Sequence, residues 1–132
     1  MNKKTKLISP EVLMCWTEEE KKAFKQYVDS ELIHEPIKLI GGYKFYLGTL
    51  KHEITIRLFV PFQSQQILFE QSHFIHTPTQ LGAYETSRPW NDNVYAAINQ
   101  VLQGFTEYYN SAIRAGYEPD DSWLVPNPNF RN

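Results

Sequence analysis

The chain has 132 residues, of which 42% are hydrophobic and 21% charged, and its formal net charge is −2. This profile is typical of one globular domain and excludes collagen-like and disordered chains. No stretch approaches the ~20 apolar residues that a membrane span needs, so we expect no membrane partner. We expect residues 1–132 to form a single domain, with an N-terminal arm at 1–8 and an irregular C-terminal tail at 117–132.

The charged residues are unevenly distributed along the chain, and the chain has a single cysteine. All nine lysines lie between Lys3 and Lys51, so residues 1–66 carry a net +2 and residues 67–132 a net −4. We interpret this as a solvated N-terminal region; the alternative is a dipolar molecule whose ends meet different partners or each other. Cys15 cannot form an intrachain disulfide, which favours a reducing compartment and a cytoplasmic location.

Two helix starts lie near the N-terminus. The first is Ser9-Pro10, an N-cap residue followed by proline. The second is a capping box at Thr17 to Glu20, which predicts a helix from Glu18 to about Ile33 with Pro36 beyond it. An apolar stripe on this helix predicts burial of Ala23, Phe24, Tyr27, Val28 and Leu32.

Alternating residues then predict an antiparallel hairpin of Tyr43–Gly48 and Glu53–Val60. An even loop pairs Phe45 with Leu58, buries the even residues of the second strand and places Tyr46 beside Arg57 on the outer face. Both Tyr43 and Phe45 are expected in the core. We read Gly41-Gly42 as a kink, with residues 37–40 as the first arm of the meander or a flanking edge strand.

A third strand begins at Ile67, with Phe69 opposite Leu58 and Glu70 opposite Arg57. The alternation ends near Gln71-Ser72, which predicts a bulge or break before residues 73–76. One more short strand is expected around Ala83 to Thr86.

The clearest element is a helix that begins at Val94 after Asn93, carries a wide apolar arc and ends before Gly116. The expected fold class is therefore α+β: an antiparallel β-meander of three to five strands, flanked by an N-terminal helix and a long amphipathic C-terminal helix. Whether the helices cover one face of the sheet or both is left open.

Little in the sequence points to catalysis. Glu70-x-x-His73-x-x-His76 offers metal-ligand types, but strand residues three apart face opposite sides, so ordinary histidines are favoured. His52-Glu53 lies at an exposed turn, and the sequence holds no phosphate-binding glycine loop and no nucleophile elbow. We expect no catalytic residue and no cofactor.

Large aromatic and arginine side chains are enriched at binding hot spots, and the chain has 19 aromatics: eight Tyr, eight Phe and three Trp. Trp90 is alternatively a staple before a helix, and the tail either wraps back on the domain or docks on a partner through Trp123 and Phe130. The candidates for partner binding are Tyr46, Arg57, Phe59, Arg88, Trp90, Trp123 and Phe130.

Three functions compete at this point. The first is a small cytosolic, non-catalytic protein-interaction or regulatory module that self-associates, as a homodimer. The second is a metal-dependent enzyme or metal-binding protein that uses the His/Glu cluster. The third is a single-stranded nucleic-acid-binding protein that uses the aromatic and basic face of the sheet, where Lys44 and Arg57 lie near Tyr46 and Phe59.

Overall fold

An antiparallel sheet of four strands, in the order β1-β2-β3-β5, joins the other elements of the fold. The computed structural model describes residues 15–86 and 89–130. Its elements are α2 (Glu18–Asp29), β1 (Ile37–Phe45), β2 (Ile54–Pro61), β3 (Ile67–Gln71), β4 (His73–Ile75), β5 (Trp90–Asn91), α3 (Val94–Arg114), the 3-10 helix η1 (Asp121–Trp123) and β6 (Leu124–Pro126). The predicted α+β fold is confirmed.

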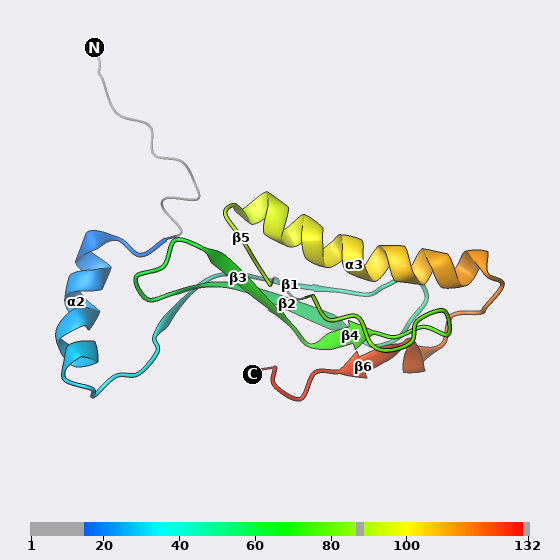
Figure 1. The fold of residues 1–132 in the computed structure, drawn as a ribbon, viewed down its shortest axis with the longest axis horizontal. Coiled ribbons are helices and arrows are strands. Elements are labelled where there is room, and N and C mark those ends of the chain that lie inside the picture. Colours follow the sequence, from blue (N-terminus) through cyan, green and yellow to red (C-terminus); the bar gives the residue numbers. More distant parts are fainter. Residues whose placement is uncertain (1–14, 87–88, 131–132) are drawn as a thin grey trace, which may run out of the picture.

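The two helices occupy different places relative to the sheet. Figure 1 shows α3 running along one side of the sheet and the C-terminal segment with β6 lying on the opposite side. Helix α2 stands beyond one end of the strands, at the blue end of the chain. The face that α3 covers is therefore the main hydrophobic layer, and α2 lies outside it.

The core is built by alternate residues of β2 and one stripe of α3. Ile54, Ile56, Leu58 and Val60 are fully buried, as the period of a half-buried strand predicts. From α3, the buried side chains are Ala97, Val101, Phe105 and Ala112. Burying a large apolar side chain stabilises the fold by about 1.5–3 kcal/mol, so this layer dominates the stability.

The strand registers are partly as predicted. Leu58 lies opposite Phe69 and Arg57 opposite Glu70, which confirms the pairing of β2 with β3. In the first hairpin Phe45 pairs with Ile54 rather than Leu58, so that prediction was wrong by four positions. The connecting loop is longer than expected because its residues Leu47 and Leu50 turn into the core. Because strand side chains alternate between the two faces of a sheet, a register shift by an even number of residues leaves each paired side chain on its predicted face.

The glycine kink and the strand break are confirmed. The β1–β2 register shifts between Leu39 and Gly41, which marks a bulge beside Gly41-Gly42. Ser72 separates β3 from β4, and β4 pairs with β6 in a second, two-stranded sheet. The short strand expected around Ala83 is reduced to a single bridge between Ile75 and Tyr84.

Both helices begin as predicted, but α2 ends early. The capping box of Thr17 and Glu20 is present, and Asn93 caps α3. The prediction that α2 reaches Ile33 was wrong: the backbone turns left-handed at Glu31, and the amides of Leu32 and Ile33 both donate to the carbonyl of Tyr27.

Two corrections concern residues near the termini. The tail is not irregular throughout, because η1 and β6 form within it and β6 pairs with β4. The helix start at Ser9-Pro10, the arm at 1–8 and the candidate Arg88 lie outside the described residues. Within the described ranges, no helix has the length and apolar character needed to cross a membrane.

Candidate interaction surface

Four of the predicted binding residues lie on the side of the sheet away from the core layer. Arg57 and Phe59 alternate along β2 with the buried Ile56 and Leu58. Directly opposite residues share a face, and Phe59 pairs with Leu68, which pairs with Trp90. Phe130 reaches the same face, since its ring lies 4.4 Å below the Arg57 guanidinium carbon. The structure thus brings these four candidates to one face of the sheet, a grouping that the sequence did not predict.

Arg57 is held by groups of its own chain. Its Nε lies 3.6 Å from Oε1 of Glu70, and both side chains are mostly buried. The predicted contact with Tyr46 was wrong, because Gly42 lies opposite Arg57 and Tyr46 follows the end of β1. Arg57 therefore joins the strand β3 and the C-terminal segment to β2.

Two of the aromatic residues predicted to bind a partner are buried in the structure. Phe59 is 7% exposed and Trp123 only 4%, so neither side chain is open to a partner in this structure. Trp123 packs edge-to-face on Tyr109, with ring centroids 5.7 Å apart, and its carbonyl accepts from the amide of His76. The alternative that the tail wraps back on the domain is the one observed. Trp90 and Phe130 are half-buried.

The metal hypothesis finds no matching geometry. Glu70 lies on β3 beside Arg57, whereas His73 lies on β4 beyond the break, with its ring stacked 5.9 Å from that of His52. His76 follows β4 and uses its backbone amide to hold the C-terminal segment. In residues 15–86 and 89–130, no group of three His, Cys, Asp or Glu side chains could hold a metal ion.

Ser72 and His73 form a serine–histidine contact, a pair that in other proteins can serve catalysis. Ser72 Oγ lies 2.8 Å from Nδ1 of His73 and accepts the amide of Thr55 at 2.8 Å. The Ser72 backbone donates to Thr55 and accepts from Asn127, so this residue ties β2, β3, β4 and the C-terminal segment together. Partial burial lowers the pKa of His73, and the neighbouring His52 lowers it further. The contact is a structural junction.

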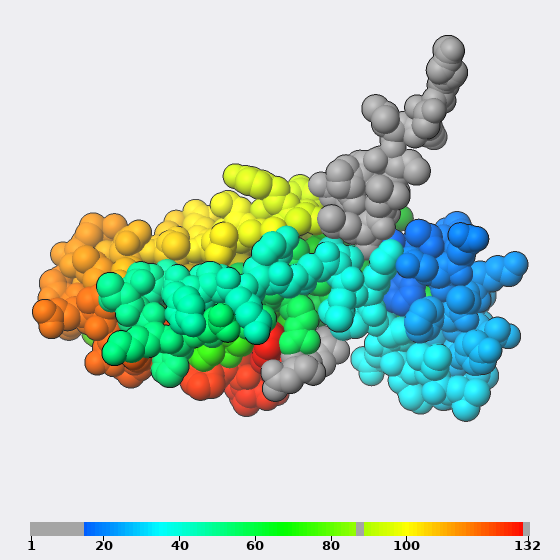
Figure 2. Space-filling model, turned by 180° about the vertical axis from the view of Figure 1, so that it is seen from behind, coloured from blue at the N-terminus to red at the C-terminus, as the bar shows by residue number. Residues whose placement is uncertain are grey.

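The exposed hydrophobic side chains gather elsewhere. Eleven large hydrophobic residues are exposed in the described ranges, and six of them lie between positions 27 and 46. These six are Tyr27, Leu32, Ile33, Leu39, Tyr43 and Tyr46, and we call the stretch along α2 and the β1 edge that carries them the α2–β1 surface. Leu39 lies opposite Phe59 and Tyr43 opposite Ile56, so the surface follows the edge of the sheet and includes side chains from both of its faces. The prediction that Tyr27, Leu32 and Tyr43 belong to the core was therefore wrong. Figure 2 shows β1, the teal band, along the front of the molecule between α3 and the C-terminal segment.

An apolar groove adjoins this surface where α2 meets the sheet. It has a volume of about 440 Å³ and is lined by Val28, Glu35, Pro36, Ile37, Phe59, Pro61 and Phe62. Non-glycine residues with positive φ flank it: Glu31, Glu35 and Gln63. Left-handed backbone is unfavourable for such residues and is enriched at functional sites.

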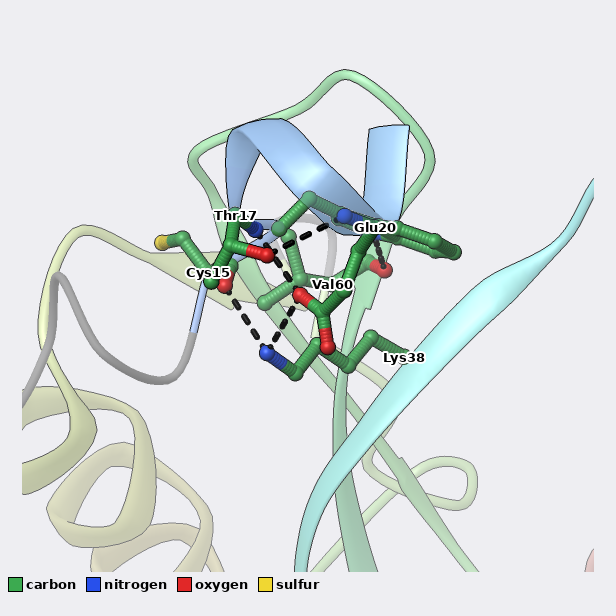
Figure 3. Close-up of polar contacts among 6 residues, drawn as sticks. Cys15, Thr17, Glu20, Lys38 and Val60 are labelled. Carbon is green, nitrogen blue, oxygen red and sulfur yellow. Dashed lines mark hydrogen bonds and ion pairs between the residues drawn. The ribbon is translucent and has the colours of Figure 1, made fainter. Parts of the chain in front are cut away.

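A polar lock fixes α2 to the start of β1. The Lys38 ammonium donates to Oε1 of Glu20 at 2.8 Å and to the carbonyl of Cys15 at 2.9 Å (Figure 3). The hydrogen bond from Lys38, together with that from the Thr17 amide, lowers the pKa of the Glu20 carboxyl. Trp16 Nε1 donates to the Val60 carbonyl, and the Trp16 ring packs edge-on against Phe24 and Phe62. These contacts hold α2 in a fixed position relative to β1 and β2.

Sequence reasoning placed Tyr27 and Leu32 in the core because an apolar stripe on a predicted helix looks the same whether a partner covers it or the core does. The available signal was charge: α2 has seven charged residues in twelve, which leaves a narrow apolar stripe. Comparisons of the chain with protein-family models, curated proteins and solved structures found no match.

Proposed function

We propose that the chain is a small, non-catalytic protein-interaction module that binds its partner, including a second copy of itself, through the α2–β1 surface. The observation that carries the proposal is that six of the eleven exposed large hydrophobic residues in the described ranges lie on α2, on β1 or directly beside them. Exposed apolar patches of this kind mark interaction sites in folded proteins. A regulatory effect would follow from binding alone, without chemistry by this chain.

The side chains that could take part in catalysis make structural contacts instead, which supports a non-catalytic role. Ser72, His73 and Arg57 are each engaged by neighbouring strands or by the C-terminal segment. The single cysteine fits a reducing compartment, and we propose that the protein acts in the cytoplasm.

The nucleic-acid alternative is less favoured by the charges on the sheet. Lys44 Nζ lies 3.9 Å from Oε1 of Glu53, and Arg57 lies beside Glu70. Affinity for nucleic acids comes mainly from cations that neutralise phosphates, and here each cation has an acidic neighbour. An oligonucleotide titration that depends steeply on salt would revive this alternative.

The proposal is tested with two matched double variants. Leu32→Gln with Leu39→Gln alters the α2–β1 surface, whereas Leu81→Gln with Leu102→Gln alters exposed leucines elsewhere. Sedimentation velocity and affinity capture from the native host, followed by stoichiometry of any complex, are compared with the wild type.

We expect a self-complex or a stoichiometric hetero-complex that the surface variant loses and the control variant retains. A wild type that forms neither, or two variants that behave alike, would overturn the proposal. Thermal unfolding of both variants checks that the monomer fold is intact.

A further inference from the structure

We infer that a second copy of this chain occupies the α2–β1 surface, with the two β1 strands side by side and antiparallel across a two-fold axis. This inference rests on the proposed function and names its partner. The sheet would continue through both copies, with β1 and the β1 of the partner at its centre.

The first argument is the open edge of the sheet. β1 ends the strand order, so within residues 15–86 and 89–130 no strand pairs with one side of this nine-residue strand, whereas the opposite edge, β5, has only two residues. Long exposed edges pair with other chains unless they are guarded, commonly by lysines or by bulges, and β1 has one bulge, between Leu39 and Gly41. The Lys38 ammonium does not guard β1, because it turns back to Glu20 and Cys15. Gly41 and Gly42 leave the middle of the strand without side chains.

The second argument is that exposed apolar residues lie along both halves of the β1 edge, so that a two-fold rotation brings one half of each copy beside the other half of its partner. Leu32 and Ile33 lie before β1, Leu39 lies within it, and Tyr43 and Tyr46 lie at or beyond its far end. An antiparallel arrangement places the aromatic end of one copy against the aliphatic end of the other. Leu39, which is 59% exposed, lies near the axis in this arrangement. A self-complementary patch is what an isologous dimer requires.

The third argument is charge complementarity along the same surface. Glu31 and Glu35 precede β1, and Lys44 lies near its C-terminal end. The Lys44 side chain is 66% exposed and makes only a long contact of 3.9 Å with Oε1 of Glu53, so it can still reach a carboxylate of a second copy. Antiparallel docking brings the acidic end of each copy to the basic end of the other, twice per dimer. Parallel docking would set like charges together, which is unfavourable.

The test is a charge swap measured by sedimentation equilibrium. Glu35→Lys and Lys44→Glu should each weaken the dimer by about tenfold, because each change creates two repulsive contacts per dimer. The double variant should recover to within about threefold of the wild type, since the opposite charges face each other again. Glu107→Lys, a matched change on the exposed side of α3, should leave the dimer unchanged.

The outcomes separate this inference from the proposed function. A wild type that stays monomeric at every concentration overturns the inference, while a hetero-complex that the surface leucine variant loses would still support the proposed function. A dimer that the single charge changes weaken, but that the double variant does not recover, overturns the antiparallel pairing of β1.

Discussion

Helices α3 and α2 carry comparable sequence signals but have different fates in the fold. Both begin at capped N-termini and both show an apolar stripe. Helix α3 buries four residues of its stripe against the sheet, whereas α2 buries none. A periodic pattern therefore predicts a helix and its apolar face, but it does not say what covers that face. Of the α2 stripe, Phe24 packs against Trp16 and Phe62, whereas Tyr27 stays exposed and belongs to the interaction surface that continues along β1.

The largest expected contrast comes from deleting one phenylalanine ring in each of the two helices. Phe105→Ala in α3 should lower the free energy of unfolding by about 3–5 kcal/mol, because Phe105 is 2% exposed and packs against Phe45. Phe24→Ala in α2 should cost about 1–2 kcal/mol, since its ring is half-buried against Trp16 and Phe62. Urea unfolding measures both. Equal losses would mean that α2 is as deeply integrated as α3.

The next effect concerns the loop that carries Leu47 and Leu50 into the core. Gly48 has φ +54, and a Cβ there would collide with the Tyr109 phenol. Gly48→Ala should cost about 1–2 kcal/mol from backbone strain alone. Gly82→Ala is the control, because a Cβ there meets no neighbouring atom. Thermal unfolding that cannot tell the two variants apart would contradict this assignment.

Most of the fold followed from the sequence, and the errors share a physical cause. Caps, turn residues and the alternation of β2 are local signals, so α3, the β2–β3 register and the break at Ser72 were predictable. The first hairpin register depended on the loop between Phe45 and Ile54, whose length is set by burial of its leucines. The binding residues Phe59 and Trp123 were misjudged because neighbours distant in sequence cover them.

The two N-caps give a smaller and more local comparison. Thr17→Ala and Asn93→Ala each remove a side chain that accepts a backbone amide, a loss of about 1 kcal/mol. We expect Asn93→Ala to lower global stability in urea. Thr17→Ala should mainly speed amide hydrogen exchange within α2, because α2 buries no residue and can open by itself. A full global loss from Thr17→Ala would show that α2 unfolds together with the core.

The smallest effect is a dependence of stability on pH through His73. Its pKa is lowered in the folded state by partial burial and by His52, so the unfolded chain binds the proton more readily. Between the lowered pKa of the folded state and the ordinary histidine pKa of about 6.5, stability should therefore rise with pH. It should decline as the pH falls below about 6.5.

His73→Gln removes the titrating ring, so its unfolding free energy should change less between pH 7.5 and 5.5 than that of the wild type. His52→Gln removes the second cause of the shift and should give an intermediate change. Urea titrations at the two pH values measure this, and an unaltered pH dependence in His73→Gln would refute the assignment.

The central claim is that β1, the open edge beside α2, is where a second copy docks. Amide hydrogen exchange of the wild-type protein, followed by mass spectrometry at a low and a high protein concentration, tests it most directly. The account predicts that residues 37–45 become more protected at high concentration, while β2 and the buried stripe of α3 stay unchanged. Exchange in β1 that is independent of concentration, or new protection confined to the exposed side of α3, would contradict it.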